Sequence, residues 1–402
     1  MSFQQGLSGL NAASTALDVT GNNIANANTV GFKSGRAEFA DVYANSLTGA
    51  STNAVGIGVK VAAVTTQVTQ GNISVTSNPF DLAINGGGFF RMSDNGTVTY
   101  TRNGQFQLDD QGFLVDSGRR RLTGYAADAA GNIVPSAPVD IQLSTSDIAP
   151  NATTTVDVVT NLDSREALPA VAPFDPTDAS TFNSSTALTI YDTLGNPHIM
   201  GLYFVKTGAN AWDLYTNLDG GAAGAATPIA YDSLGALTTA MPLAQSFPVA
   251  TGAATPLNFA LDLTGSTQFG SPFGVNSIIQ DGYTSGRLTG VFVGADGTVQ
   301  GRYSNGQARD LAQVVLTTFI NVQGLKPLGD NQYAETPDSG AALVGAPTTG
   351  SLGTLQAAAV EESNVDLTAE LVNLITLQRL YQANAQTIKT QDQVLQTLVN
   401  LR

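Results

Sequence analysis

Cysteine is absent from all 402 residues of the chain. This absence excludes disulfide bridges, zinc ribbons, iron–sulfur clusters and cysteine nucleophiles, since each of them needs a thiol or thiolate. Histidine is almost as scarce, because His198 is the only one. A zinc or iron site would have to rest almost wholly on carboxylates, and no Asp and Glu cluster resembles the twelve-residue calcium loop. We therefore expect no metal and no cofactor.

Charge is also sparse. Asp, Glu, Lys and Arg make up 12% of the chain, against a usual share of about 25%. The net charge is −15, so the chain has no general attraction to phosphate backbones or anionic membranes. No apolar run approaches the about 18 residues of a membrane-spanning helix, and the N-terminus lacks the features of a cleaved signal peptide. We expect no nucleic-acid partner, no membrane insertion and no ordinary signal peptide.

Proline is missing from both ends, since none of the 16 prolines lies in the first 78 residues or after Pro347. In both ends, large apolar residues recur at a spacing of seven, which predicts a helix with one apolar stripe and a coiled coil. The N-terminal row is Phe3, Leu10, Leu17 and Ile24, with Leu7 and Ala13 on the same side. The C-terminal row is Leu367, Leu374, Tyr381, Ile388 and Leu395, with Leu371, Ala385 and Val399 four residues after members of it.

The remaining faces of these two helices carry little charge. Residues 1–30 contain a single ionisable side chain, Asp18, whereas a solvated coiled coil has Glu and Lys beside its seam. Seven Asn or Gln residues in 1–30 and ten in 364–400 take their place. We interpret these helices as enclosed by other helices in a close-packed tube of subunits. The alternative is a monomeric helical hairpin docked on a domain. Either Asn364 or Asp366 can cap the C-terminal helix.

Between the ends, the apolar pattern changes to a period of two with frequent turn signals, which predicts strands. Three such signals are Asp94-Asn95-Gly96, Arg102-Asn103-Gly104 and Ala295-Asp296-Gly297. Asn-Gly and Asp-Gly supply the positive φ angles of tight hairpin turns. The predicted strands lie at 98–100, 106–108, 186–192, 198–206 and 212–216, and within 288–303. The middle of the chain is therefore predicted to be all-β.

If the first and last helices pack together, the chain leaves and returns along one line and its domains are nested. The expected fold class is a multidomain protein with α-helical coiled-coil termini and nested, discontinuous all-β domains. The expected parts are a terminal coiled-coil domain or inner tube (1–33 with 360–402), a connecting segment (34–70), an inner β domain (71–145 with 285–358) and an outer β domain (146–284).

Candidate catalytic and binding residues do not form a site. His198 opens a strand after a turn, and no Gly-x-Ser-x-Gly elbow accompanies it. Gly86-Gly87-Gly88 is followed by Phe89-Phe90 where a phosphate-binding loop needs Lys and Ser or Thr, so we interpret it as a turn or bulge. Arg119-Arg120-Arg121 either contacts an acidic face of a neighbouring subunit or is a solvated face. We expect no enzyme.

Three sets of motifs resemble those of bacterial flagellar rod and hook proteins. The N-terminal set is Ser8-Gly9-Leu10-Asn11-Ala12-Ala13, then Asn22, Asn23, Ile24 and Asn26, then Gly31, Phe32 and Lys33. The central set is Asp81-Leu82-Ala83-Ile84, Gly88-Phe89-Phe90 and Tyr100-Thr101-Arg102-Asn103-Gly104 with Phe106. The C-terminal set is Glu362-Ser363-Asn364-Val365-Asp366-Leu367, then Tyr381, Asn384 and Ala385-Gln386-Thr387-Ile388-Lys389-Thr390.

This resemblance spans about 1–125 and 280–402, and the length and the extra β insertion favour the hook members of the family over the shorter rod members. It implies a homopolymer: a curved, flexible tube that couples rod to filament, transmits torque and is located outside the cell in the hook. The implied partners are a rod protein, a hook cap, hook–filament junction proteins and the flagellar type III export apparatus. The helices of the ends would fold only on polymerisation.

Two other readings stay open. A rod subunit shares the terminal motifs, and a β-rich surface adhesin shares the acidic, threonine-rich β domains. Only an axial subunit explains matched apolar rows at both ends with uncharged flanks. A secreted hydrolase lacks any supporting group of residues.

Overall fold

The computed structural model of the chain describes residues 2–42, 56–128, 131–144 and 146–400. The chain divides into two compact units. Unit 1 comprises residues 1–144, 290–302 and 308–402, and unit 2 comprises residues 145–289 and 303–307. Unit 2 is thus inserted into the sequence of unit 1.

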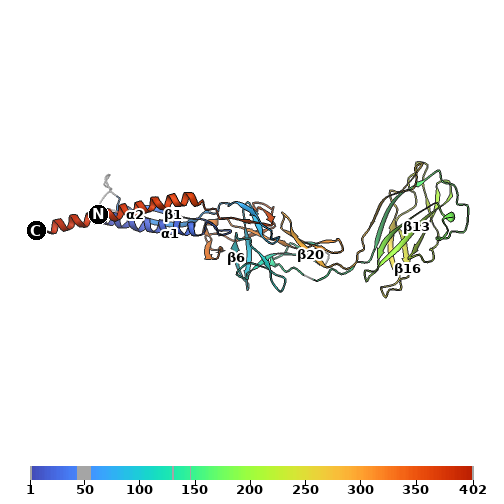
Figure 1. Cartoon of the computed structure of the whole chain (residues 1–402), viewed down its shortest axis with the longest axis horizontal. Helices are drawn as coiled ribbons and strands as arrows, with labels where there is room; N and C mark the ends of the chain where they lie inside the picture. The colour runs from blue at the N-terminus through green and yellow to red at the C-terminus, as the bar shows by residue number, and fades with distance from the viewer. Residues whose placement is uncertain (1, 43–55, 129–130, 145, 401–402) are drawn as a thin grey trace. The chain divides into compact units, whose positions relative to one another are not determined.

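Unit 1 has a long helix at each end of the chain, α1 (Ser2–Ala25) and α2 (Leu367–Asn400). The two lie side by side (Figure 1). They run antiparallel, because Gly6 lies against Ile388 and Asn23 bonds to Glu370. An antiparallel ribbon of β1 (Gly35–Val42) and β2 (Gly58–Thr66) packs against α1. Part of 34–70, where the sequence predicted only a connection, is therefore paired strand.

The β part of unit 1 is built around a 13-stranded sheet. Its main path is β20 (Leu288–Val293), β21 (Thr298–Tyr303), β22 (Ala308–Val314), β9 (Arg121–Ala126), β5 (Phe89–Asp94), β6 (Thr97–Thr101), β25 (Gln332–Ala334) and β24 (Lys326–Gly329). Branching from it are β7 (Gln107–Leu108), β8 (Leu114–Val115), β10 (Val139–Asp140), β23 (Leu316–Thr318) and β26 (Leu343–Gly345).

Two short pairs complete unit 1, each joining an early strand to a late one. They are β3 (Ile73–Val75) with β28 (Ala359–Glu361), and β4 (Leu82–Asn85) with β27 (Thr354–Ala357). A 3-10 turn, η2 (Val322–Gly324), lies in a late loop. Edge-to-face aromatic pairs fill the core, including Phe90 with Phe106 at 5.2 Å between ring centroids. The same core contains Leu82 and Leu122 together with Leu316 and Leu355, so it joins segments from both halves of the chain.

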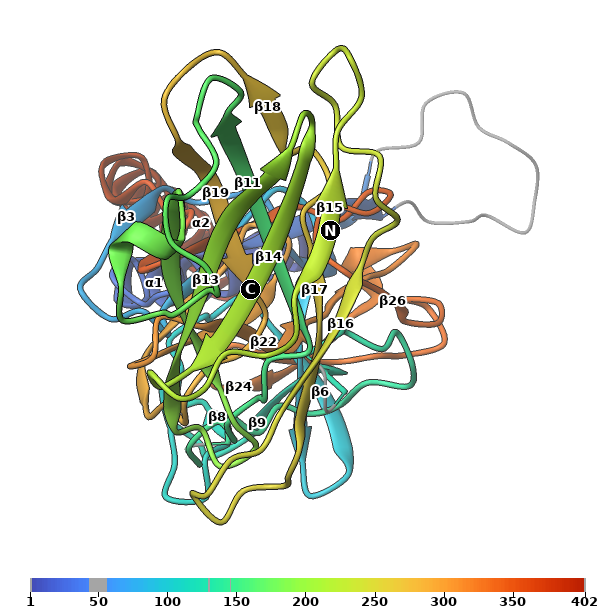
Figure 2. The same ribbon diagram turned by 90° about the vertical axis from the view of Figure 1, so that its right-hand side faces the viewer.

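Unit 2 consists of two sheets that share one apolar core. The first is β12 (Ser184–Tyr191), β13 (Pro197–Gly208), β14 (Ala211–Leu218) and β15 (Thr227–Ala230); Figure 2 shows β13, β14 and β15 side by side. The second is β16 (Leu243–Phe247), β17 (Leu257–Asp262), β11 (Thr155–Asp163), β18 (Thr267–Phe269) and β19 (Gly274–Gln280). A 3-10 turn, η1 (Ala179–Thr181), precedes β12.

Alternation along the strands of unit 2 explains why its sheets face each other. On β14, Trp212 and Leu214 are buried while Asp213 and Tyr215 lie on the other face, as the period of two requires. Trp212 is the only tryptophan of the chain. Its fluorescence therefore reports on unit 2 alone.

The predicted fold class holds in its coarse form: the protein is mainly β, with several sheets and two terminal helices. The predicted strands coincide with β6, β7, β12, β13, β14, β20 and β21. Asn95 and Gly96 have φ angles of 49° and 93°, as the predicted hairpin turn between β5 and β6 requires. The coiled coil stays a prediction.

The prediction of a hairpin turn with positive φ angles at Arg102-Asn103-Gly104 was wrong. Neither Asn103 nor Gly104 is among the residues with positive φ. Gly104 is required for a different reason, because a Cβ there would overlap the carbonyl oxygen of Leu82 and lie 3.0 Å from the ring of Phe90. The backbone of this motif therefore packs directly against β4.

We predict that Gly104→Ala lowers the free energy of unfolding of unit 1 by about 1–3 kcal/mol through overpacking. Urea unfolding followed by far-UV circular dichroism measures the change, with Trp212 fluorescence as the reference for unit 2. Gly290→Ala is the matched control, since a Cβ at Gly290 meets no atom within 4 Å. Equal stability of the two variants would contradict the close approach.

Candidate functional site: a buried ion-pair network at the base of the terminal helices

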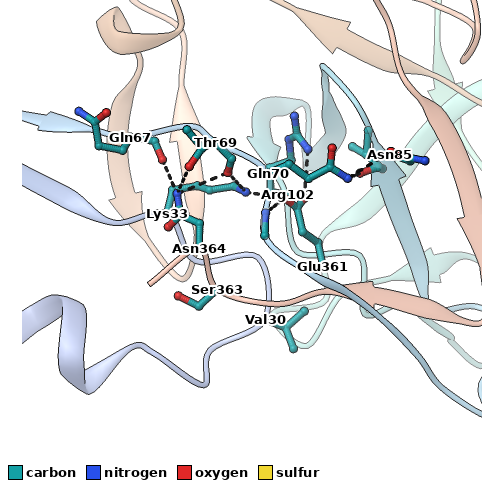
Figure 3. A network of polar contacts seen from close by, with 12 residues as sticks. Val30, Lys33, Gln67, Thr69, Gln70, Asn85, Arg102, Glu361, Ser363 and Asn364 are labelled. Carbon is teal, nitrogen blue, oxygen red and sulfur yellow. Dashed lines mark hydrogen bonds and ion pairs between the residues drawn. The ribbon is translucent and has the colours of Figure 1, made fainter. Parts of the chain in front are cut away.

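The side chain of Glu361, the last residue of β28, is completely buried and binds two cations. Lys33 Nζ lies 2.5 Å from Glu361 Oε1, and Arg102 Nη1 lies 3.0 Å from Glu361 Oε2. The backbone N–H of Gly71 also donates to Oε1, at 2.9 Å. Figure 3 shows Lys33, Arg102 and Glu361 converging from three segments of the chain. We call these three side chains the Glu361 network.

The two cations of the Glu361 network are themselves enclosed. Lys33 Nζ also donates to the carbonyl oxygen of Thr69 at 2.7 Å, and Arg102 Nη2 donates to that of Gly86 at 2.9 Å. Burial lowers the pKa of Lys33, and the ion pair with Glu361 opposes this effect. Two buried cations share one carboxylate, so removing that carboxylate would leave both without a counter-charge.

Hydrogen bonds tie the segment that follows α1 to the same place. The N–H of Gly31 donates to the carbonyl oxygen of Glu361 at 2.7 Å, and the side chain of Asn331 donates to that of Val30 at 2.8 Å. Gly31 has a φ of 72°, and a Cβ there would lie 2.5 Å from the backbone nitrogen of Asn103. Only glycine fits this position without strain. Two residues of the predicted N-terminal motif therefore meet the central motif: Gly31 packs against Asn103, and Lys33 shares the carboxylate of Glu361 with Arg102.

Asn364 and Asp366 have different tasks at the base of α2. Asp366 caps the helix, because its Oδ1 accepts from the N–H groups of Thr368 and Ala369 at 2.9 and 3.1 Å. Asn364 instead accepts from the N–H of Ser34 at 2.8 Å and donates to the carbonyl oxygen of Gln67 at 2.7 Å. Of the two predicted caps, the structure selects Asp366. Asn364 joins the chain beyond α1 to the base of α2.

Small residues of α1 form the seam with α2. Gly6, Gly9, Ala13, Ala16 and Thr20 recur at helical spacing on one side of α1, and most are buried. A Cβ at Gly6 would lie 3.0 Å from Ile388 Cγ1, and one at Gly9 would lie 2.9 Å from the side chain of Asn384. Such positions allow the two backbones to approach closely.

The predicted apolar row of α1 lies about a quarter-turn from this seam. Phe3 and Leu7 are each 45% exposed, and Leu10, Leu17 and Ile24 are half-buried. Only Ala13 of the predicted set belongs to the buried seam. The ribbon covers the other side of α1, where Ser8 Oγ accepts from the N–H of Val59 at 3.2 Å.

On α2, the predicted row is divided. Leu374, Ile388 and Ala385 are half-buried, whereas Tyr381, Leu367, Leu371, Leu395 and Val399 are exposed. The register of Gly6 with Ile388 places Leu395 and Val399 beyond the start of α1. Leu371 points away from the seam, together with Val372 and Ile375.

The predicted asparagines of the N-terminal motif differ in role. Asn23 is buried and donates to Glu370 Oε1 at 3.0 Å and to the carbonyl oxygen of Gly35 at 2.9 Å, so it joins α1, α2 and the ribbon. Asn26 bonds locally to Asn22. Phe32 is half-buried between Gly31 and Lys33.

The other candidates are engaged within the chain. Arg120 pairs with Asp116 at 2.7 Å, and Arg121 pairs with Asp140 at 3.3 Å and lies over the ring of Phe113. Gly86 and Gly88 have positive φ angles just before β5, in agreement with a turn. Among the described residues, no cluster of three Asp, Glu or His could hold a metal ion, and no helix has the length and hydropathy to span a membrane.

Sequence profiles of four flagellar families match the chain in consecutive parts. They are Flagella basal body rod protein (3–33), Flagellar hook protein FlgE/F/G D1 domain (83–159), Flagellar basal body protein FlaE D2 domain (161–283) and Flagellar basal body rod FlgEFG protein C-terminal (356–401). The two profiles at the ends contain α1 except its first residue and all of α2, and the others fall on β strands. These matches and the fold define a structural component of the bacterial flagellum.

Full-length relatives narrow this class. The chain is 45% identical to the flagellar hook protein FlgE of Escherichia coli (strain K12) and 44% identical to that of Salmonella typhimurium (strain LT2), covering 100% of each chain. A solved structure, the Helicobacter pylori flagellar hook protein FlgE2, shares the fold with a TM-score of 0.54 at 14% identity, over 70% of this chain and 99% of that one. The chain belongs to the flagellar hook protein FlgE family, the structural subunits of the hook.

Sequence reasoning missed Glu361 and Arg102 as functional partners. Glu361 lies just outside the quoted C-terminal motif, and nothing local to it indicates a distant lysine. The small-residue seam did leave a signal, because Gly6, Gly9, Ala13 and Ala16 alternate spacings of three and four.

We predict that Glu361→Gln lowers the free energy of unfolding of unit 1 by about 3–5 kcal/mol, because Lys33 and Arg102 lose their counter-charge in a buried place. Urea unfolding followed by far-UV circular dichroism measures this loss. Glu362→Gln, the same change at the next, exposed residue, should cost less than about 0.5 kcal/mol. Similar values for both variants would show that the network contributes little.

Proposed function

We propose that this chain polymerises through its terminal helices, with 1–33 and 360–402 as a coiled-coil inner tube of the hook. The inner β domain (71–145 with 285–358) and the outer β domain (146–284) are stacked outward, and 34–70 connects tube and β domains. The tube is curved and flexible, couples rod to filament and transmits torque. The chain acts as a building unit and not as an enzyme.

The observation that carries this proposal is that each terminal helix has two different faces. The small-residue face of α1 packs against α2 of the same chain, as Gly6 and Gly9 show. The large apolar residues lie elsewhere: Leu7 of α1 and Leu371 of α2 are both 45% exposed. Exposed apolar rows of this size favour burial against other helices. In a homopolymer, the partner is another copy of the chain.

The end of α2 supports the same assignment. Leu395 and Val399 continue the apolar row past the start of α1 and are 49% and 74% exposed. Charged side chains, which would keep such a surface in water, are few beside these rows: Asp18 is the only one in residues 1–30, and the 34 residues of α2 contain Glu370, Arg379, Lys389 and Asp392. A helix of another copy that packs here would meet mostly Asn, Gln, Thr and apolar groups.

The base of the helices also supports the proposal, because it fixes where the tube segment meets the β domains. Lys33 and Glu361 lie at the boundary between the proposed tube and the rest of the chain, and their ion pair is buried. A subunit that transmits torque needs a stiff connection at this point. The helices beyond it are rich in polar residues, and isolated helices have marginal stability in water, so we infer that they fold fully only when other copies cover them.

The remaining partners follow from the family. A rod protein lies at one end of the hook, junction proteins and the filament at the other, and a hook cap covers the growing end. Export through the flagellar type III apparatus would deliver the chain unfolded to a place outside the cell. The lack of cysteine suits this route, since no disulfide has to form or break.

We predict that Leu371→Glu weakens polymerisation, because it would bury a charge between subunits. The concentration of chain needed for tubes should rise at least about tenfold, which corresponds to about 1.4 kcal/mol per contact. Sedimentation and electron microscopy in salting-out conditions measure it. Leu371→Met, which keeps an apolar side chain of similar size, is the matched control and should form curved tubes.

The monomers of both variants should give the same circular dichroism spectrum, since Leu371 is exposed in the single chain. Tubes of Leu371→Glu at the normal concentration would contradict an interface at this face.

A further inference from the structure

His198, the only histidine, lies at the start of β13 with 5% of its surface exposed. Its Nδ1 is 2.6 Å from Asp219 Oδ2, and its Nε2 is 3.3 Å from Asp192 Oδ2. A carboxylate oxygen only accepts hydrogen bonds, so each ring nitrogen needs a proton to bond to it. The geometry therefore fits the doubly protonated imidazolium. A neutral ring would turn one lone pair toward a carboxylate.

The two carboxylates connect the ring to three segments of unit 2. Asp192, in the turn after β12, also accepts from Thr251 Oγ1 at 2.5 Å and from the N–H groups of Leu194 and Asn196 at 2.9 Å. Asp219, after β14, accepts from the N–H of Ile199 at 2.8 Å. Thr251 lies in the loop between β16 and β17.

The turn held by Asp192 rests on the stretches by which the chain enters and leaves unit 2. Gly195, at its tip, has a φ of 80°, and a Cβ there would lie 2.7 Å from Pro150 and 3.2 Å from Thr284. Residues 148 and 151 pair with 286 and 283 through backbone hydrogen bonds. A change in this turn therefore acts directly on these stretches.

We propose that His198 is a proton-operated clamp of unit 2. Its imidazolium ties the 192–196 turn, the end of β14 and the Thr251 loop together, and loss of one ring proton loosens them. The charged groups that face the ring are the carboxylates of Asp192 and Asp219, and the Thr251 loop contributes a hydroxyl.

The pH dependence has a definite sign. Burial alone would lower the pKa of His198, but hydrogen bonds to Asp219 and Asp192 outweigh it and raise the pKa. Burial would likewise raise the pKa of Asp192, yet its hydrogen bonds hold that pKa below its usual range. Because the folded chain binds the histidine proton more tightly, the stabilisation is complete below the unfolded pKa of about 6.5. It is lost as the pH rises through the folded pKa.

Unit 2 contains a second turn of the same design without a histidine, which serves as an internal control. Tyr191-Asp192-Thr193-Leu194-Gly195 and Tyr231-Asp232-Ser233-Leu234-Gly235 differ at one position. Asp232 Oδ1 accepts from the N–H groups of Leu234 and Ala236 at 2.8 Å, and Gly235 has a φ of 82°. The two turns thus have the same hydrogen bonds from backbone N–H groups to the aspartate Oδ1; the first also has Asn196 Nδ2 donating to Asp192 Oδ2 at 2.9 Å, and only the first has the clamp.

The first test is the NMR titration of the untagged full chain, in which the single histidine gives one Cε1–H signal. We expect a midpoint above 6.5, and a midpoint lower by at least about one pH unit in Asp219→Asn, which removes the closer carboxylate. Asp219 is exposed in part, so this variant should fold. A wild-type midpoint at or below 6.5, or an unchanged midpoint in the variant, would overturn the proposal.

The second test is hydrogen exchange of backbone amides, corrected for the intrinsic effect of pH. Exchange at Leu194, Asn196 and Ile199 should rise at least about threefold as the pH passes the midpoint, because the clamp opens more often. The amides of Leu234 and Ala236 should not change. Equal behaviour of the two turns would show that proton loss does not release the clamp.

Discussion

The carboxylate of Glu361 receives a lysine from 328 residues away and an arginine from 259 residues away, in a place closed to water. Two cations on one buried carboxylate make this interaction hard to replace, since no solvent can take over a lost partner. The interaction also joins three segments of unit 1: the stretch after α1, the stretch after β6 and the end of β28. The chain must leave α1, form its β strands and return beside Gly31 before α2 can begin.

Because the Glu361 network holds the base of the two helices, α1 and α2 can pack against each other in only a few ways. The glycine and alanine face of α1 is the one that can approach α2 closely. Asn23 fixes the position of α1 along α2 and the ribbon through its hydrogen bonds to Glu370 and Gly35. The larger residues, such as Leu7 and Leu371, are then turned outward. The seam within the chain and the contacts that we propose between copies therefore use different residues: small ones for the first and large ones for the second.

Local signals predicted much of this structure. The period-seven rows located both helices, and Asn95-Gly96 located a hairpin, because each depends on residues close in sequence. The motifs also led to the family. The Glu361 network could not be predicted, since its partners are selected by the tertiary fold. The seam was missed because large apolar residues suggested the contact face, whereas close backbone approach selects Gly6 and Gly9. The ribbon of β1 and β2 was not predicted, although β1 alternates in burial on both sides of a bulge between Glu38 and Phe39.

The most direct test is an electron cryo-microscopy map of tubes grown from this chain, at a resolution that shows side chains. The account predicts that Gly6 and Gly9 pack against α2 of the same copy, that the Glu361 network is intact, and that Leu7 and Leu371 are buried against other copies. A map with Leu7 and Leu371 in solvent, or with the small-residue seam formed between two copies, would contradict it.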